Sequence, residues 1–165
     1  MASGAHDDVD ITGEDGALAT RKSAYYSYRS AVCGEVLQAE GEAYAEFTWV
    51  SDDYVMVGVA RAGVDPSSVR GGLYTTADGW MYYCDTGGHH HNDWRSTPWA
   101  SGSPQAIKKK GGTVGLLLRR GSLSVHIGGR QVGVMCTGLT GELVWAADLY
   151  NSGTSVRIAR KPPPA

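Results

Sequence analysis

The side chains best suited to chemistry in this sequence gather at residues 89–91, three consecutive histidines with Cys84, Asp85 and Asp93 close by. In an extended chain, the first and third histidines point one way and the second points the other. At most two of them could therefore bind the same zinc ion, whereas structural zinc sites use four ligands. Because further ligands would require the chain to fold back, we expect an exposed polar loop here and no bound metal.

Other constellations that could support catalysis or phosphate binding are weaker. The Lys108–Lys110 run is expected to be a solvated loop, because the whole chain is slightly acidic. The glycines within 128–133 lie inside a strand hairpin and not between a strand and a helix, so they do not predict a phosphate loop. We expect His126 on the polar face of a strand, and Asp148 either outward or satisfied by hydrogen bonds. Since no known catalytic motif occurs either, we predict no catalytic residues and no cofactor.

The composition is that of one small globular domain. The chain has 165 residues, of which 15 are basic and 17 acidic, so the formal net charge is −2. This balance provides no general attraction to nucleic acid or to an acidic membrane surface. Residues 1–10 lack the apolar core of a signal peptide, and the chain has no run of about 18 apolar residues that would predict a membrane helix.

The cysteines bear on the cellular compartment. Cys33, Cys84 and Cys136 are odd in number and widely spaced, without a Cys-x-x-Cys pair. Proteins of reducing compartments use cysteine in this way, whereas a small disulfide framework needs closely spaced pairs. We therefore expect three free thiols in an intracellular, cytoplasmic protein.

The elements that must position these residues are short strands. Leu123, Val125 and Ile127 alternate with polar neighbours, and a Gly-Gly pair at 128–129 separates them from the strand 130–134. Two glycines supply the positive φ angles of a tight turn, so this segment predicts a β-hairpin. Residues 43–49 alternate in the same way. Further strands are expected at 55–60, 114–118, 143–150 and 155–160.

The strand count predicts the fold class. The runs at 55–60 and 114–118 are continuously apolar, as in strands that are covered on both faces. The only stretch with helix-forming residues is 35–46, where we expect a loop or a short helical turn before the strand. We therefore predict an all-β protein, a bent antiparallel β-sandwich of the concanavalin A-like or jelly-roll type, with roughly ten or more short strands and no long helix.

Four stretches in this order resemble the SPRY domain, the core of the B30.2 domain, over residues 9 to 160. They are GEAYAEF at 41–47, VGVA at 57–60 with Gly-Trp-x-Tyr at 79–82, GTVGLLLRRGSLSVHI at 112–127, and TGLTGELVWAADLY with SVRI between 137 and 158. The resemblance implies a domain at 9–160 between a polar, flexible N-terminal tail at 1–8 and a Pro-rich C-terminal tail at 161–165.

The resemblance also implies a function. SPRY domains are non-catalytic modules that bind a peptide segment or surface of a partner protein through loops at one end of the sandwich, as adaptors, scaffolds or substrate-recognition domains. Such a module would be monomeric or part of a larger assembly. Transferred to this sequence, the partner-binding residues lie in three groups: Tyr28 and Arg29; Val69, Arg70 and Tyr74; and Leu149, Tyr150 and Asn151. Tyrosine and arginine are enriched at binding hot spots, which agrees with this assignment.

A second function fits the same architecture. Lectins of the legume and galectin types share a two-sheet sandwich, and tryptophan rings stack on sugars. Trp80, Trp94 and Trp99 would be the stacking residues, with Asp and Asn side chains as polar contacts. The free cysteines and the polar N-terminus argue against a secreted lectin, so glycan binding is the alternative to protein binding.

Overall fold

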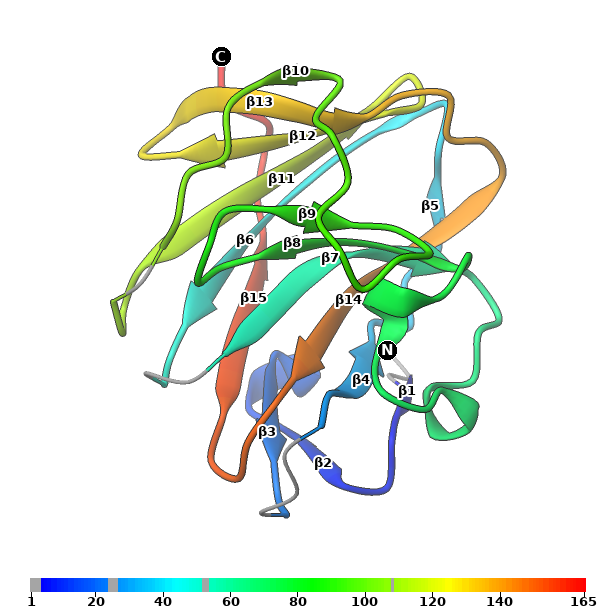
Figure 1. The fold of residues 1–165 in the computed structure, drawn as a ribbon, viewed down its shortest axis with the longest axis vertical. Coiled ribbons are helices and arrows are strands. Elements are labelled where there is room, and N and C mark those ends of the chain that lie inside the picture. Colours follow the sequence, from blue (N-terminus) through cyan, green and yellow to red (C-terminus); the bar gives the residue numbers. More distant parts are fainter. Residues whose placement is uncertain (1–3, 24–26, 52–53, 108) are drawn as a thin grey trace.

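The structure is a computed structural model that describes residues 4–23, 27–51, 54–107 and 109–165. Two antiparallel sheets pack face to face (Figure 1). The first sheet has the strand order β1-β4-β14-β7-β8-β9, with β5 paired to β14. Its strands are β1 (Gly4–Ala5), β4 (Arg29–Val32), β5 (Leu37–Gln38), β7 (Val55–Arg61), β8 (Gly79–Tyr83), β9 (His89–His90) and β14 (Glu142–Leu149).

The second sheet has the order β10-β13-β12-β11-β6-β15-β3-β2. Its strands are β2 (Val9–Thr12), β3 (Leu18–Arg21), β6 (Glu42–Trp49), β10 (Ser101–Gly102), β11 (Thr113–Arg119), β12 (Ser122–Ile127), β13 (Arg130–Cys136) and β15 (Ser155–Arg160). The described helices are three short 3₁₀ turns, η1 (Glu14–Gly16), η2 (Pro66–Ser68) and η3 (Leu73–Thr75). The predicted all-β sandwich is therefore confirmed.

The individual strand predictions agree with this arrangement. The β12–β13 hairpin turns at Gly128 and Gly129, whose φ angles of 61° and 77° lie in the left-handed region that favours glycine. The alternating segment at 43–49 lies in β6. The stretch 35–46 contains no helical turn: it forms β5, a turn at 39–41 and the start of β6, so the helical alternative was wrong.

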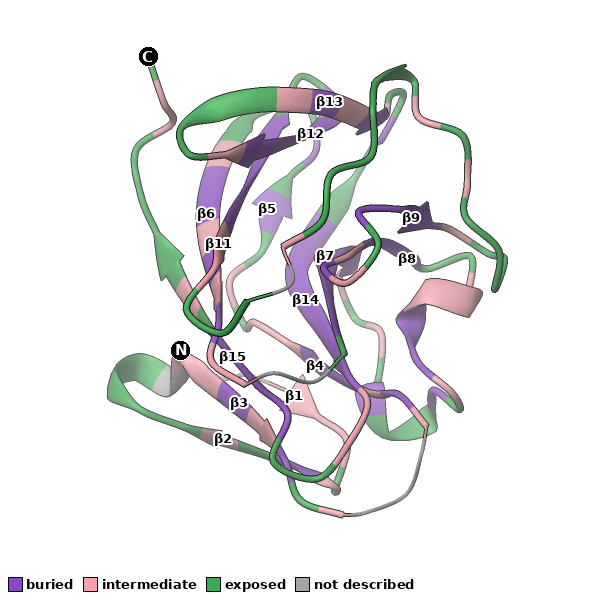
Figure 2. Cartoon of the chain, turned by 60° about the vertical axis from the view of Figure 1, so that its left-hand side comes forward, coloured by how far each residue is buried: buried purple, intermediate pink, exposed green. Residues whose placement is uncertain are grey.

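The main core lies between the sheets. Phe47 and Trp49 of β6 face Val57 of β7 and Trp145 of β14, and the exposed fraction of each is 3% or less. Because side chains alternate along a strand, every second residue of β7 contributes to this core. Figure 2 shows that β7 and β14 are buried over most of their length.

A second apolar cluster covers the outer face of the first sheet. Met56 and Ala60 of β7 join Met81 of β8 and Val144 of β14 on this face. The segment 62–78, which carries η2 and η3, packs over them. The continuously apolar sequence at 55–60 is thus explained, since β7 is covered on both faces as predicted.

The two chain ends contact the sandwich. Gly4–Ala5 pairs with β4, so part of the predicted N-terminal tail lies against the first sheet, while residues 1–3 are outside the described part. At the other end, the Lys161 N–H donates to the Tyr44 carbonyl directly after β15. The domain boundaries at 9 and 160 stay a prediction. In the described residues, no helix is long and apolar enough to cross a membrane.

Gly58 allows β7 and β8 to approach each other, which yields a first prediction. A Cβ at Gly58 would overlap the Trp80 carbonyl oxygen and lie 2.9 Å from the Met81 Cα. We expect Gly58→Ala to lower the free energy of unfolding by about 1–3 kcal/mol, as overpacking does. Gly4→Ala is the control, because its Cβ would meet Val32 Cγ2 at an ordinary 3.4 Å. Urea denaturation measures both, and equal stability of the two variants would contradict this packing.

Candidate functional site

Five tyrosines and one histidine form an aromatic group on the outer face of the first sheet, here called the tyrosine cluster: Tyr28, Tyr54, Tyr74, Tyr83, His90 and Tyr150. The Tyr28 ring is central, with its centroid 5.1 Å from that of Tyr74 and 5.0 Å from that of Tyr150. Tyr54 extends the group at 5.6 Å from Tyr150. The rings meet edge-on or tilted, which is the favourable geometry for aromatic pairs.

The cluster is buried at its centre and open at its rim. Tyr28 is 8% exposed, whereas Tyr54 is 42% exposed and Tyr150 is half-buried. Burial raises the pKa of Tyr28, and the neighbouring hydroxyl of Tyr83, which accepts a hydrogen bond from it, raises it further. The hydroxyl of Tyr28 is therefore neutral at physiological pH. The rim at Tyr54 and Tyr150 is accessible to solvent, and tyrosine offers both an apolar ring and a hydroxyl to another molecule.

A buried carboxylate fixes the loop that carries Tyr74. Asp148 on β14 is completely buried, and Oδ1 accepts hydrogen bonds from Ser30 Oγ at 2.6 Å and from the Leu73 N–H at 3.0 Å. Its Oδ2 accepts from the Tyr74 N–H at 3.0 Å. Burial raises the pKa of this carboxyl, and the three hydrogen bonds oppose that rise. The backbone of η3 is thereby attached to the sheet, and Tyr74 is held against Tyr28.

Gly72 makes this attachment possible. It has a φ of 99°, and a Cβ there would lie 2.7 Å from the Tyr28 Cβ and 2.9 Å from Asp148 Oδ2. Only glycine combines this backbone conformation with so close an approach. The chain can therefore enter η3 directly above the carboxylate.

A buried guanidinium fixes the other side of the cluster. Arg21 at the end of β3 is 1% exposed, and its Nη1 donates to the carbonyls of Leu149 and Tyr150, each at 3.0 Å, and to that of Ser27. Its Nη2 forms an ion pair with Asp8 at 3.4 Å. Since Tyr150 follows β14 and Ser27 precedes Tyr28, Arg21 holds the two chain segments that carry these rings.

The structure brings together four of the eight sequence-predicted partner-binding residues. Tyr28, Val69, Tyr74 and Tyr150 pack in the outer cluster. The other four are not members of this cluster: Arg29, Arg70, Leu149 and Asn151.

These four residues differ in what they can offer a partner. Arg29 begins β4 directly after Tyr28. Burial lowers the pKa of the Arg21 guanidinium, and the nearby charge of Arg29 lowers it further. Arg70 is exposed in the covering loop, and Asn151 stands in the turn after Tyr150. Leu149 is fully buried in the core between the sheets, so its side chain offers no contact surface. Partner binding by all eight stays a prediction.

Sequence reasoning missed Tyr54, Tyr83, His90 and Arg21 as members or supports of this site. One signal could have found the first two. A strand that is apolar on both faces must be packed against other residues on its outer face as well as in the core. Tyr54 and Tyr83 lie at the ends of β7 and β8 on that outer face. Arg21 carries no such signal, because its partners lie up to 129 residues away in the sequence.

Two of the three histidines are buried and His91 is half-buried, which corrects the expectation of an exposed loop. His89 and His90 form β9 and are 1% and 6% exposed. His89 Nε2 contacts the Pro98 carbonyl at 3.0 Å, whereas His91 stacks on Trp80 with 4.4 Å between ring centroids. Their rings thus serve packing, in opposite directions as the alternation predicted. No group of three potential metal ligands occurs among the described residues.

The other constellations are also spread apart. His126 shares the polar face of its strand with Ser124, as predicted, and is buried there at 7% exposure against the ring of Tyr44. Its strand belongs to the second sheet, and Asp148 lies on the outer face of the first, with hydrogen bonds as expected. Lys109 and Lys110 are exposed, while Lys108 lies outside the described residues. The three cysteines are free, as expected.

The tryptophans considered for sugar stacking have different environments. Trp80 is 7% exposed beneath Arg61 and His91, and Trp99 is half-buried against Tyr82 and His89. Trp94 alone among the three is well exposed, at 68%. They do not present a shared surface of stacked rings.

The attachment by Asp148 gives a second prediction. In Asp148→Asn the amide keeps one acceptor oxygen but turns an NH₂ group toward a backbone N–H donor. We expect the free energy of unfolding to fall by about 1–3 kcal/mol, the cost of a buried unsatisfied donor. Asp78→Asn, at an exposed position, should change it by less than about 0.5 kcal/mol. Chemical denaturation measures both, and equal effects would contradict a structural role of Asp148.

The buried histidines give a third prediction. Burial lowers the pKa of His89, His90 and His126 below the ordinary 6.5. Because the unfolded chain binds these protons more readily, their contribution to stability is full above pH 6.5 and is lost as the pH falls through the lowered values. His90→Phe keeps a ring against Tyr74 and removes one titrating group. It should reduce the loss of stability between about pH 7.5 and 5.5; an unchanged pH profile would contradict the assignment.

Comparisons with known proteins agree on the fold. No protein-family model and no curated protein matches the chain. Among solved structures, the SPRY domain of human HERC1 aligns with a TM-score of 0.70 at 19% identity, covering 94% of this chain and 97% of that one.

Two further solved structures agree. A human SPRY domain aligns with a TM-score of 0.68 at 15% identity, with coverage of 91% and 95%. The TRIM65 PSpry domain aligns with 0.65 at 13% identity, with coverage of 96% and 89%. At these low identities, the comparison supports a shared fold. The sequence motifs described above resemble the same family, the SPRY domain. The protein therefore has the SPRY-domain fold.

Proposed function

We propose that the protein is a non-catalytic interaction module, and that the tyrosine cluster binds a peptide segment or surface of a partner protein. It would act as an adaptor, a scaffold or a substrate-recognition domain. The single observation that supports this most is the grouping of Tyr28, Tyr74 and Tyr150, which come from three distant parts of the sequence and share one partly open surface.

The physical properties of the cluster suit protein recognition. Tyrosine supplies a large contact area and a hydroxyl with few rotatable bonds, so binding costs little conformational entropy. Asp148 and Arg21 fix the backbone on two sides of the rings, which lowers that cost further. Such pre-ordered aromatic anchors are the residues that dominate protein–protein binding energies.

The surroundings supply polar contacts for a peptide backbone or side chain. The exposed guanidinium of Arg70 lies in the loop that also carries Tyr74, and Arg29 lies at the other side beside Arg21. Arg29 Nη1 donates to the Tyr28 carbonyl at 3.1 Å, whereas its Nε is buried and not accessible to a peptide. A rim with donors around an aromatic centre is the usual anatomy of a protein interface.

Glycan binding remains the second candidate, and one observation favours it. Trp94 is 68% exposed, and the Arg95 guanidinium lies 5.2 Å from its ring centroid. One accessible tryptophan is a smaller platform than the tyrosine cluster, so protein binding ranks first. A cytoplasmic location also stays a prediction.

A display library of random peptides tests the proposed function. Wild-type protein should select a consistent peptide motif, and Tyr150→Ala should weaken binding of that peptide about 30-fold, corresponding to about 2 kcal/mol for a hot-spot residue. Tyr54→Ala should weaken it as well, because this ring forms the exposed rim. Binding is measured by calorimetry on variants whose circular dichroism matches the wild type.

Trp94→Ala is the matched control, since it removes an exposed aromatic ring that is absent from the cluster. Peptide binding that survives Tyr150→Ala and Tyr54→Ala would contradict the proposed site. Selection of no motif, together with sugar binding on a glycan array that Trp94→Ala abolishes, would favour the glycan alternative instead.

A further inference from the structure

A cleft lies at the place in the second sheet where β3 begins and the neighbouring strand β15 extends past it. The cleft has a volume of about 440 Å³, which is within the range of small-molecule sites. It is lined by residues of the segment 13–18, which includes η1, and by Arg157, Ile158 and Arg160 of β15. Arg21, which supports the tyrosine cluster, lies at the opposite end of β3, so the cleft is a separate site.

An interrupted strand ladder leaves backbone groups open to this cleft. β3 pairs with β15 only as far as Arg157, which is opposite Leu18, whereas β15 continues to Arg160 alongside β6. The Ile158 N–H still donates to the Ala17 carbonyl, at 2.9 Å. Because every second residue of a strand bonds to the same neighbour, the peptide groups of Arg160 are turned to the same side as those of Ile158. No strand of the described chain runs there, so a ligand can bond to them.

The cleft carries charged side chains of both signs that are not paired with one another. Glu14 and Asp15 are exposed in η1, and Arg157 is exposed on β15. Within the described ranges, none of these three forms an ion pair, whereas Arg160 is paired with Glu35. A ligand that carries both an anionic and a cationic group can therefore pair with Arg157 and with one of the two carboxylates at the same time.

The turn that carries the two carboxylates is attached to β15. Gly13 and Asp15 have φ angles of 83° and 55°, in the left-handed region that glycine adopts freely and aspartate tolerates. The Ala17 N–H donates to the Glu14 carbonyl at 3.2 Å, and the Ala17 carbonyl accepts from Ile158 of β15. These bonds hold the carboxylates beside the strand that carries Arg157.

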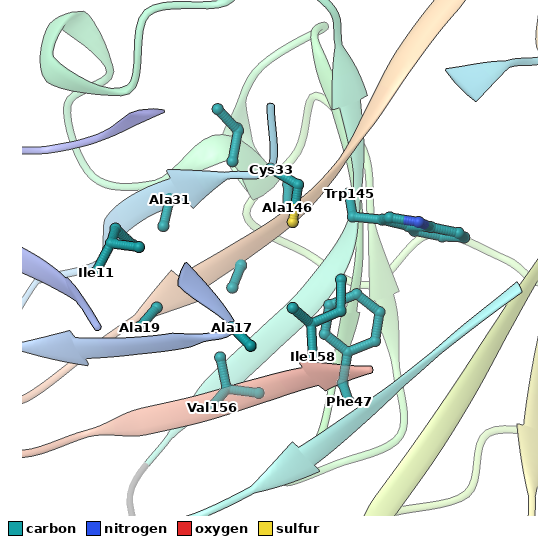
Figure 3. Close-up of a pocket in the computed structure, with 12 residues that line it drawn as sticks. Ile11, Ala17, Ala19, Ala31, Cys33, Phe47, Trp145, Ala146, Val156 and Ile158 are labelled. Atoms are coloured by element: carbon teal, nitrogen blue, oxygen red, sulfur yellow. The ribbon is translucent and has the colours of Figure 1, made fainter. Parts of the chain in front are cut away.

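Apolar side chains supply the remaining lining. Ala17, Leu18 and Ile158 are half-buried, and Ala17 and Ile158 also border the apolar space between the two sheets (Figure 3). That space has a volume of only about 30 Å³, which is too small for an organic group. A ligand therefore stays within the cleft, where its apolar part contacts these three side chains.

We propose that the cleft binds a small zwitterionic molecule of about the size of a dipeptide with both ends free. The carboxylate of the ligand pairs with Arg157, its ammonium group pairs with Glu14 or Asp15, and its amide bonds to the open backbone at Arg160. An aliphatic side chain of the ligand lies against Ile158. The site does not depend on the function proposed for the tyrosine cluster.

The dipeptide alanyl-leucine is the probe. Its titration into isotope-labelled protein, followed by NMR, should give saturable shifts at the backbone amides of Glu14, Ala17, Ile158 and Arg160. Acetylation of its N-terminus or amidation of its C-terminus removes one charge, and each should weaken binding about fivefold, as expected for an ion pair at a partly exposed site. Shifts that do not saturate, or equal binding of the three peptides, would overturn the proposal.

Arg157→Gln tests the contact with the carboxylate. It should weaken binding of alanyl-leucine about fivefold and leave binding of the amidated peptide unchanged, because that peptide already lacks the same pair. Arg130→Gln is the matched control, an exposed arginine on β13 of the same sheet, and should change neither. Amide signals outside the cleft verify that both variants are folded. Equal effects of the two variants, or an equal loss for both peptides in Arg157→Gln, would contradict the proposed site.

Discussion

The carboxylate of Asp148 is the group on which the arrangement of the candidate site depends. It lies on the central strand β14 with no exposure to solvent, where an unpaired charge would be costly. Hydrogen bonds from Ser30 and from the backbone N–H groups of Leu73 and Tyr74 compensate for that cost. The same bonds attach the covering loop to the sheet. A requirement of burial thus becomes a constraint on where Tyr74 can lie.

The sandwich supplies the rigid support for this constraint. Because β7 and β14 are covered on both faces, the outer cluster rests on strands that are also packed into the main core. Arg21 adds a connection from the second sheet, since it holds the carbonyls of Leu149 and Tyr150 from the end of β3. The tyrosines are therefore positioned by both layers of the protein, although they project from loops and strand ends. Loops on a rigid scaffold are the usual carriers of binding function.

Much of the fold was predictable because its signals are local. The Gly128-Gly129 turn and the alternation in β6 depend on neighbouring residues. The continuous apolar run in β7 indicated that this strand is buried on both of its faces. The site was predictable only in part. Tyr28, Tyr74 and Tyr150 came from the resemblance, whereas the partners of Asp148 lie 74 or more residues away and leave no pattern in the sequence. The exposure of the histidines was mispredicted because histidine is a polar residue type. In the structure, the His91 ring stacks on Trp80 and the His89 ring packs against Trp99.

Amide hydrogen exchange at Leu73 and Tyr74 tests most directly whether Asp148 holds the covering loop. These two N–H groups belong to a short 3₁₀ turn outside the sheets, where exchange would ordinarily be fast. If the carboxylate holds them, both should exchange as slowly as the paired amides of β14 and much more slowly than that of the exposed Ser67 in η2. Exchange at the rate of Ser67 would contradict the claim that a buried carboxylate positions the tyrosine cluster.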